Sequence, residues 1–284
     1  MNGRPRYATT LSSVTDTIDA HRRPLGFAVL GGPTTVIDIA GLRIVIDPTF
    51  DPAGDHGYLT KTAGPAVSAA QLGAVDVVLV SHDEHPDNFD TAGRAFAHAA
   101  PLLLTHPRAA QRLGPPAHGL EPWETIELPG GTGHAVVVQA VPAVHGPADG
   151  TRNDTGHINC EVTGFVLSGA GIPTVYLSGD NASLNAVQNI RDTIGTVDVA
   201  VLFAGAARVA TKERNRPLTL TGQRAAAAAE VLGARTVIPA HVDSWAHFSE
   251  GLDEFVTAFD EAGLGHLIAD APHGQWIVPD SAAV

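Results

Sequence analysis

The sequence predicts an α/β fold in a single domain. Short runs of apolar, β-branched residues alternate with segments of helical character, which is typical of layered α/β proteins. The run VDVVLV at residues 75–80 returns as VDVAVL at residues 197–202, so the chain resembles a loose duplication. No stretch is rich enough in Pro, Gly and Ser for an interdomain linker. We therefore expect one domain over residues 1–284, with residues 1–24 as a polar N-terminal extension.

Composition and charge narrow the classes of function. The net charge of −13 argues against nucleic-acid binding, which needs a basic surface. No apolar run reaches the ~18–20 residues of a membrane span, and no apolar signal segment follows the first residues. We expect a cytoplasmic protein that acts on a small molecule, with the oligomeric state, including a homo-oligomer, left open. The 14 histidines invite a search for a metal site, and because there is one cysteine, any metal must be held by histidines and carboxylates.

The first half of the chain is predicted to begin with an antiparallel meander. A near-continuous apolar strand, of the kind buried on both faces, follows at residues 75–81 and leads into a His-rich loop. An Ala-rich helix is expected at residues 91–99. The other strands of this half are expected at residues 27–30, 35–39, 43–47, 102–105, 136–141 and 161–167.

The second half repeats this order of strand, loop and polar side chain. Thr219 or Thr221 can cap the N-terminus of a helix at residues 223–232, and Gly233 stops it. A second helix is expected at residues 252–262. The strands of this half are expected at residues 173–180, 197–203, 236–240 and 266–269.

Four separated strands run into side chains that bind metals. They are followed by residues 81–88 (SHDEHPDN), by His145, by Asp180 and by His241. Loops at strand ends, positioned by a rigid sheet, are where binding residues collect. The chemistry of the protein is therefore expected at this cluster of strand ends.

Taken together and in this order, these motifs resemble those of the metallo-β-lactamase superfamily. Its signature is His-x-His-x-Asp-His after one strand, then a lone His, a lone Asp and a last His. Residues 31–37 (GGPTTVI), 46–48 (IDP), 178–180 (SGD) and 238–241 (IPAH) are similar to its ascorbate-6-phosphate lactonase-like and N-acyl-phosphatidylethanolamine phospholipase D-like branch. The resemblance covers about residues 26–269. It implies a four-layer αββα sandwich of two mixed sheets flanked by helices.

The resemblance also implies a site for one or two divalent metal ions, zinc or manganese, with iron as a further option. The implied ligands are His82, His85 and His145 for the first ion, Asp180 as a bridge, and Asp87 with His241 for the second. Two ions ~3.5–4 Å apart can share a water whose pKa is lowered toward ~7. The implied reaction is hydrolysis of a small ester, lactone or phosphoester by a metal-held hydroxide.

The His-rich motif departs from the family pattern in two places. It has one extra residue between its first two histidines, and it ends in Asn88 instead of histidine. Placing the extra residue at Asp83 or Glu84 keeps His82 as a ligand, whereas the rival register puts Asp83 in the first ligand position. Because the neutral amide oxygen of Asn88 is a weaker ligand than imidazole for zinc-like ions, we expect the second ion to bind weakly or to be absent.

The remaining candidates assist the site. Asp87 is expected to orient the nucleophile, and His247 to donate a proton or grip the substrate, against the alternative of aromatic packing. Asp47 is either a turn residue or a partner that orients a ligand, and the resemblance favours the second reading. His157 either contacts a metal ligand or the substrate, or is a solvated loop residue. Cys160 is expected to be inert, on an apolar face in or beside a strand.

Two other functions stay open. One is a phosphodiesterase or nuclease of the same fold, against which the net charge of −13 counts. The other is a metal-binding protein without catalytic activity, for which the altered His-rich motif is the supporting feature.

Overall fold

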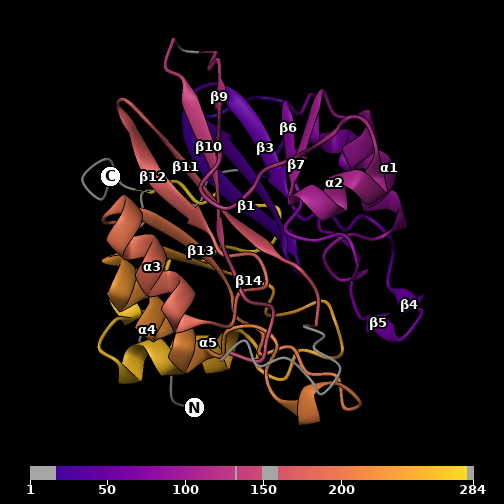
Figure 1. Ribbon diagram of the computed structural model, residues 1–284, viewed down its shortest axis with the longest axis vertical. Helices are drawn as coiled ribbons and strands as arrows, with labels where there is room; N and C mark the ends of the chain where they lie inside the picture. The colour runs from indigo at the N-terminus through magenta and orange to yellow at the C-terminus, as the bar shows by residue number, and fades with distance from the viewer. Residues whose placement is uncertain (1–16, 132, 149–158, 280–284) are drawn as a thin grey trace.

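Two mixed β-sheets pack face to face and carry helices on their outer faces (Figure 1). The computed structural model describes residues 17–131, 133–148 and 159–279. This is the four-layer αββα sandwich predicted from the sequence. A separate two-stranded hairpin projects beside the first sheet and consists of β4 (Gly54–His56) and β5 (Leu59–Lys61).

The first sheet has the strand order β1-β2-β3-β6-β7-β8. The first three strands form the predicted antiparallel meander, and β3, β6, β7 and β8 run parallel to one another. The strands are β1 (Leu25–Gly31), β2 (Thr34–Ile39), β3 (Leu42–Ile46), β6 (Val77–Leu79), β7 (Leu102–Thr105) and β8 (Ala117–Gly119).

The second sheet has the strand order β14-β13-β12-β11-β10-β9. Strands β9 to β12 are antiparallel neighbours, and β12, β13 and β14 are parallel. The strands are β9 (Thr125–Leu128), β10 (Val136–Pro142), β11 (Thr163–Gly169), β12 (Ile172–Leu177), β13 (Val199–Phe203) and β14 (Thr236–Ala240).

The two sheets repeat one local arrangement, which explains the duplicated VDV runs. In each sheet the strand that begins within the run pairs in parallel with an earlier strand, β6 with β3 and β13 with β12. The aspartate of each run accepts a backbone N–H from the residue just before the first parallel pair: Asp76 from Arg43 at 2.7 Å, and Asp198 from Thr174 at 2.9 Å. The repeat therefore fixes the register of the parallel strands in both halves.

Side chains alternate between two buried faces along the central strands. In β13, Val199, Val201 and Phe203 point into the layer between the sheets, whereas Ala200 and Leu202 pack toward the helices. Both sets are buried, so the strand is apolar throughout. The main core therefore lies between the sheets, and a second apolar layer lies under the helices of the second sheet.

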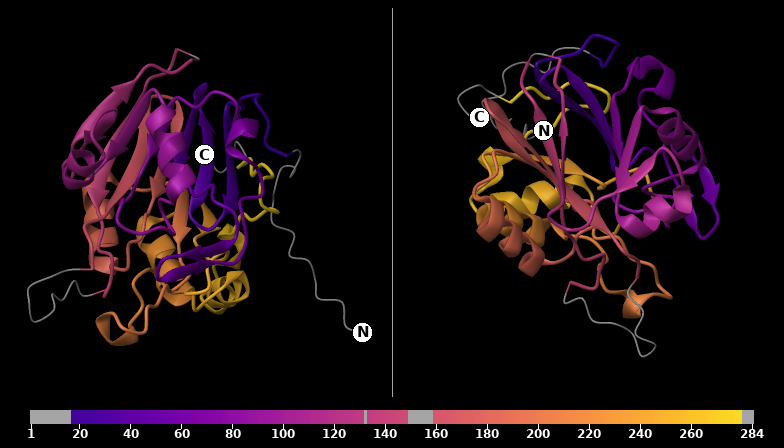
Figure 2. Two further views of the ribbon diagram at one scale, coloured as in Figure 1. Left: turned by 90° about the vertical axis from the view of Figure 1, so that its right-hand side faces the viewer. Right: turned by 45° about the horizontal axis from the view of Figure 1, so that its top comes forward.

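The helices form two groups on opposite sides of the sheets (Figure 2). The first group packs near β6 and β7, and the second covers the outer face of the second sheet. The α-helices are α1 (Thr91–Ala99), α2 (Pro107–Leu113), α3 (Leu184–Ile194), α4 (Gly222–Leu232) and α5 (Leu252–Glu261). Short 3₁₀ helices are η1 (Ala69–Leu72), η2 (Glu213–Asn215) and η3 (Gly265–Leu267).

One predicted strand is wrong. Residues 266–269 begin in η3, and only Ile268 makes a single parallel bridge, to Val237 at the edge of the second sheet. The chain turns here because the Leu267 N–H bonds Leu264 and the Ile268 N–H bonds Gly265. Within the described residues, no helix is long and apolar enough to cross a membrane.

Candidate metal centre

The candidate site lies where strands of both sheets end. Its side chains are buried and follow five different strands. They are Asp47 after β3, His82, His85, Asp87 and Asn88 after β6, His145 after β10, Asp180 after β12 and His241 after β14. The φ angle of Gly179 is +53°, and a Cβ there would lie 2.8 Å from the Ser81 Cβ, so glycine lets the ends of β6 and β12 approach each other.

Three imidazoles converge at the first part of this site. The His85 Nδ1 lies 3.0 Å from the His82 Nε2 and 3.0 Å from the His145 Nε2. The ring centroids are 4.9 to 5.0 Å apart. Three histidines that are far apart in the chain therefore direct one nitrogen each at a common point.

The outer nitrogens of two of these rings have fixed partners. The Ser81 hydroxyl donates to the Asp47 carboxylate at 2.6 Å, so it accepts from the His82 Nδ1, 3.0 Å away. The His145 Nδ1 donates to the Leu218 carbonyl at 2.9 Å. A histidine that donates through one nitrogen presents a lone pair at the other. The inward nitrogens of His82 and His145 are therefore lone-pair donors.

The protonation of these rings is set by burial. Burial lowers the pKa of His82 and His145 well below the usual value, and mutual repulsion with His85 lowers it further. The pKa of His85 falls to about 4, again chiefly through burial. A proton on the His85 Nδ1 could satisfy only one of the two lone pairs that face it, whereas a cation would satisfy all three nitrogens. The three neutral imidazoles therefore fit a divalent metal ion of the zinc, manganese or iron type.

A second group of donors lies beside the first and consists of Asp87, Asp180 and His241. The His241 Nε2 is 3.4 Å from the Asp87 Oδ2 and 3.5 Å from the Asp180 Oδ1. Buried atoms without a hydrogen-bond partner occur on all three side chains, including both ring nitrogens of His241. Such atoms are costly to bury, and a metal ion would satisfy them. This group also fits a divalent ion.

Asp180 links the two groups. Its Oδ2 lies 3.4 Å from the His145 Nε2, whereas its Oδ1 faces His241. Burial raises the pKa of Asp180 to about 6, and the Asp87 carboxylate contributes to this rise. A positive charge between the two groups would keep both carboxylates ionised.

His247 contacts the second group from the pocket side. Its Nε2 lies 3.0 Å from the Asp87 Oδ2, and its side chain is mostly buried, with 11% of its surface exposed. Burial alone would raise the pKa of Asp87, but the imidazoles of His241 and His247 beside its carboxylate hold that pKa well below the usual value. The ring of His247 also packs against Phe248. Both alternatives for His247, a polar contact and aromatic packing, therefore occur together.

Asp47 and Asn88 support the site from below. Asp47 accepts the Ser81 N–H at 2.6 Å and the Asn88 Nδ2 at 3.0 Å, and burial raises its pKa to about 7. The same Nδ2 donates to the Asp180 Oδ1 at 2.9 Å. Asn88 therefore uses its amide nitrogen to hold two carboxylates, and the Asn88 Oδ1 has no hydrogen-bond partner.

Asp83 points away from the three imidazoles. Its carboxylate forms an ion pair with Arg112, with the Arg112 Nε at 3.0 and 3.2 Å from the two oxygens. Its backbone carbonyl accepts a hydrogen bond from Arg94. The geometry thus favours the register in which His82 is the ligand. The other candidate, His157, lies outside the described residues.

This register has a direct test. His82→Ala is expected to weaken zinc binding by more than about 100-fold, because losing a ligand costs more than the 10–100-fold typical of losing a ligand's hydrogen-bond partner. Asp83→Asn should change the affinity by less than about threefold. Competition with a chelating dye measures both variants. The reverse ranking would place Asp83 at the metal.

A small pocket opens above both donor groups. Its enclosed volume is about 10 Å³, far below the ~300–1,000 Å³ of pockets for drug-sized ligands, so it is a narrow opening over the donor groups. His85, Asp87, His145 and His247 form its polar floor. The buried side chains of Leu59, Ala207 and Leu218 complete its walls, and the more exposed Tyr58, Val209 and Lys212 form its mouth.

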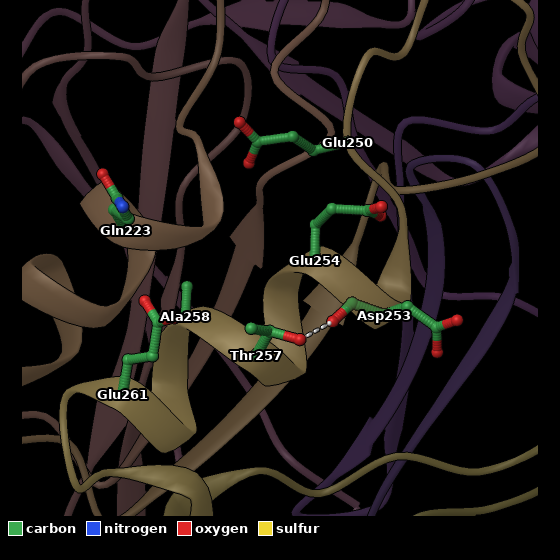
Figure 3. Close-up of a pocket in the computed structure, with 7 residues that line it drawn as sticks. All are labelled: Gln223, Glu250, Asp253, Glu254, Thr257, Ala258 and Glu261. Atoms are coloured by element: carbon green, nitrogen blue, oxygen red, sulfur yellow. Dashed lines mark hydrogen bonds between the residues drawn. The ribbon is translucent and has the colours of Figure 1, made fainter.

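A second hollow lies away from these donors, against α4 and α5 (Figure 3). It is lined by acidic side chains, of which Glu250 accepts the Gly222 N–H at 2.7 Å and Glu254 accepts the Gly251 N–H at 2.9 Å. Figure 3 shows Thr257 bonded to the Asp253 carbonyl. These contacts are internal to the helix ends, so this hollow is not the candidate site.

Comparison with known families shows the superfamily of the chain. The family model described as the β-lactamase superfamily domain matches residues 42–242, which include every side chain of the two donor groups. The chain belongs to the metallo-β-lactamase superfamily. A metal-dependent hydrolase of Methanoregula boonei is 31% identical over 192 residues, covering 66% of this chain and 75% of that protein. A metal-dependent hydrolase of Pyrococcus abyssi is 26% identical over 213 residues, covering 75% of this chain and 83% of that protein.

Solved structures show the same superfamily fold. A structure from Veillonella parvula, described as a possible metal-dependent hydrolase, superposes with a TM-score of 0.77 at 16% identity and covers 89% of this chain and 98% of that one. Isothiocyanate hydrolase from Delia radicum gut bacteria gives a TM-score of 0.73 at 19% identity with the same coverage. At these identities the likeness concerns the fold alone.

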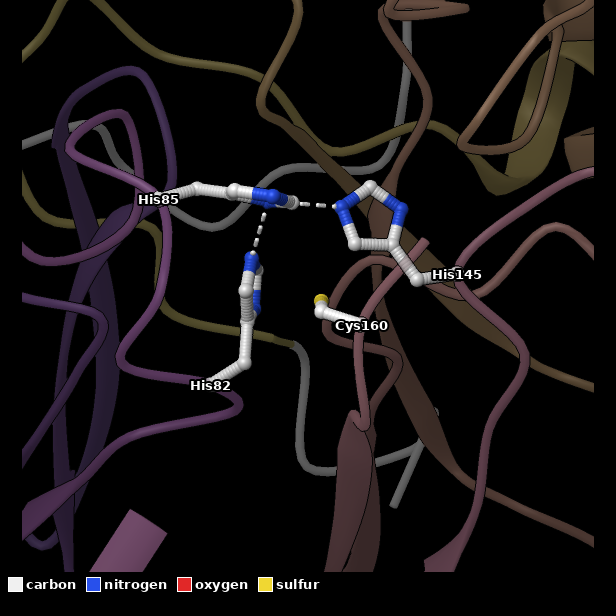
Figure 4. A group of neighbouring side chains, drawn as sticks. All are labelled: His82, His85, His145 and Cys160. Carbon is white, nitrogen blue, oxygen red and sulfur yellow. Dashed lines mark hydrogen bonds between the residues drawn. The ribbon is translucent and has the colours of Figure 1, made fainter. Parts of the chain in front are cut away.

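Three residues that lie in or beside the candidate site have no role there in the prediction from the sequence. Ser81 directly precedes His82 at the end of β6, and this position next to a predicted ligand is the sequence feature that indicates a role for it. Lys212 at the pocket mouth belongs to a basic stretch, residues 208–216, that holds four of the 17 Lys and Arg residues of an acidic chain. Cys160, expected to be inert on an apolar face, lies among the three imidazoles (Figure 4). No motif marks it.

Proposed function

We propose that this protein is a metal-dependent hydrolase that cleaves a small ester, lactone or phosphoester. The observation that carries the proposal is the convergence of two buried donor groups, with unpartnered lone pairs, beneath a small pocket. The relatives named metal-dependent hydrolases in two archaea support the same activity. The narrower likeness to lactonase-like and phospholipase-like members stays a prediction.

In this proposal the two donor groups bind one ion each. The three imidazoles would hold the first ion, Asp87 and His241 would hold the second, and Asp180, which faces both groups, would contribute a carboxylate oxygen. When bound, a zinc, manganese or iron ion polarises the substrate oxygen and lowers the pKa of a water toward ~7. The superfamily pattern has an imidazole at the position of Asn88. The amide nitrogen of Asn88 donates a hydrogen bond to Asp180 and offers no lone pair to a metal, so the second ion would bind more weakly.

The chain's own residues position the reaction. Asp47 fixes Ser81, and Ser81 fixes the ring of His82, so the first group is held rigidly from the strand ends. His247 shares a hydrogen bond with Asp87 and lines the pocket, where it can hold a proton and pass it to the departing group of the substrate. Asp87 keeps its negative charge because its pKa is low.

Lys212 favours a substrate with an anionic group. Its ammonium lines the pocket mouth, stands 5.1 Å from the centre of the Tyr58 ring and donates to Asn159 at 3.3 Å. The basic stretch around it contrasts with the net charge of −13. A carboxylate or phosphate on the substrate would gain a charge-assisted contact there.

Removing this charge tests the preference. Lys212→Gln is expected to raise the KM for an ester carrying a carboxylate by about tenfold, since a charged hydrogen bond contributes ~1.5–3 kcal/mol and 1.4 kcal/mol is tenfold in binding. The kcat and the kinetics on a neutral ester of the same size should change little. Lys212→Arg, which keeps the charge, is the matched control. An equal loss on both esters would contradict an anion-binding role.

The function itself is tested with a panel of small esters, lactones and phosphoesters. Protein loaded with zinc or manganese should hydrolyse at least one class, and the rate should fall to background after chelation and return when the ion is added back. Full metal loading without turnover of any class would favour the non-catalytic alternative.

A further inference from the structure

Cys160 is buried beside the first donor group. A buried cysteine usually packs as a small apolar side chain in the hydrophobic core, and Cys160 does not. Its Sγ and the inward nitrogens of His82, His85 and His145 all lie within 4.8 Å of one another. Figure 4 shows the thiol directed into the space between the three rings. Cys160 is 5% exposed, and it belongs to none of the apolar clusters in the described part of the chain.

The backbone holds Cys160 in this position. Three residues later, the Thr163 N–H donates to the Ser81 carbonyl at 3.0 Å, which ties the start of β11 to the residue before His82. One residue earlier, the Asn159 side chain accepts from Lys212 at the pocket mouth. The thiol is therefore placed between the strand end that carries His82 and the rim of the pocket.

A second observation points to a ligand at the same place. The Asp180 Oδ2 is fully buried, lies 3.4 Å from the His145 Nε2 and accepts no hydrogen bond. An unpaired carboxylate oxygen and inward imidazole lone pairs thus surround the point that the thiol faces. A cation between the three imidazole nitrogens and the thiol would satisfy these lone pairs.

We propose that Cys160 is a further protein ligand of the first metal ion, which adds one sulfur to the three imidazole nitrogens of that site. The inference rests on the proposed metal centre and deepens it. On binding, the S–H bond of Cys160 breaks, the proton leaves to solvent, and the sulfur lone pair forms the bond to the ion. Nothing is oxidised or reduced in this step.

A thiolate ligand makes the two sites chemically unlike. The first site combines sulfur with three imidazoles and prefers softer ions such as zinc, whereas the second, with two carboxylates and one imidazole, accepts harder ions such as manganese. Loss of the sulfur should therefore weaken zinc binding at the first site more than it weakens manganese binding.

Cobalt substitution tests the sulfur ligand on the full chain. Wild-type protein loaded with one equivalent of Co²⁺ is expected to show the sulfur-to-cobalt charge-transfer band in the near ultraviolet together with visible d–d bands. Cys160→Ser and Cys160→Ala should lose the ultraviolet band and keep the d–d bands. Zinc affinity should fall by at least about tenfold in both variants, and manganese affinity by less than about threefold.

The outcomes separate this inference from the proposed metal centre. If wild-type protein binds Co²⁺ with d–d bands but without the sulfur band, Cys160 is not a ligand, and the histidine site stands. If wild-type protein binds no Co²⁺ at all, both proposals fail. The spectrum of wild-type protein decides the question even if a Cys160 variant does not fold.

Discussion

His145→Ala is expected to abolish tight binding of the first metal ion and to lower hydrolytic activity by more than about 1,000-fold. The variant removes one of three inward imidazoles, and it also frees the Leu218 carbonyl that orients the ring. Losing only a ligand's hydrogen-bond partner typically costs 10–100-fold in metal affinity or activity, so losing the ligand should cost more. Zinc titration with a competing dye and steady-state kinetics measure both effects.

His118→Ala is the matched control, because His118 is exposed on β8 and belongs to neither donor group. Its metal affinity and activity should equal those of wild-type protein. A His145→Ala variant that still binds zinc as tightly as wild-type protein would remove this residue from the metal centre.

Chelation is expected to lower the melting temperature of the protein by roughly 10 °C. An ion present at 1,000 times its Kd contributes ~4 kcal/mol of stability, and 1 kcal/mol shifts the midpoint of a chain of roughly this size by ~2–4 °C. Without the ion, Asp87 and Asp180 repel each other, and the inward lone pairs of His82 and His145 face one His85 nitrogen that can donate to only one of them. Differential scanning fluorimetry with and without a chelator measures the shift.

Two controls sharpen this result. The His145→Ala variant should melt below wild-type protein and respond less to the chelator, because it has already lost the first ion. Dithiothreitol, at a concentration too low to strip metal, should leave the melting temperature unchanged, since one cysteine forms no internal disulfide. An identical melting temperature with and without chelator would mean that no ion stabilises the fold.

The parts of the fold that follow local patterns are the parts that the sequence predicts. The helix at residues 91–99 coincides with α1, where Asp90 caps the first turn and accepts the Gly93 N–H at 2.8 Å. Strand β6 is shorter than the predicted residues 75–81, because pairing with β3 covers only Val77 to Leu79. The helix α3 is missing from the predicted elements, since few of its residues are buried and its sequence is largely polar.

The ligand types of the site follow from strand ends, whereas the directions of individual side chains depend on tertiary contacts. Spacing keeps His82 as the ligand but leaves Asp83 as a rival, and Arg112 on a separate helix is what draws Asp83 away. Cys160 lies outside any strand, and its place depends on the bond between Thr163 and Ser81. Long-range contacts of this kind leave no periodic pattern in the sequence.

Elemental analysis of the purified chain, after saturation with zinc and removal of free ion, tests the metal centre most directly. The expected result is at least one tightly held ion per chain. The number should be nearer one than two, because the Asn88 amide N–H donates to Asp180 and Asn88 supplies no imidazole to the second ion. Less than about a tenth of an ion per chain after saturation would contradict the assignment of these buried histidines and aspartates as a metal centre.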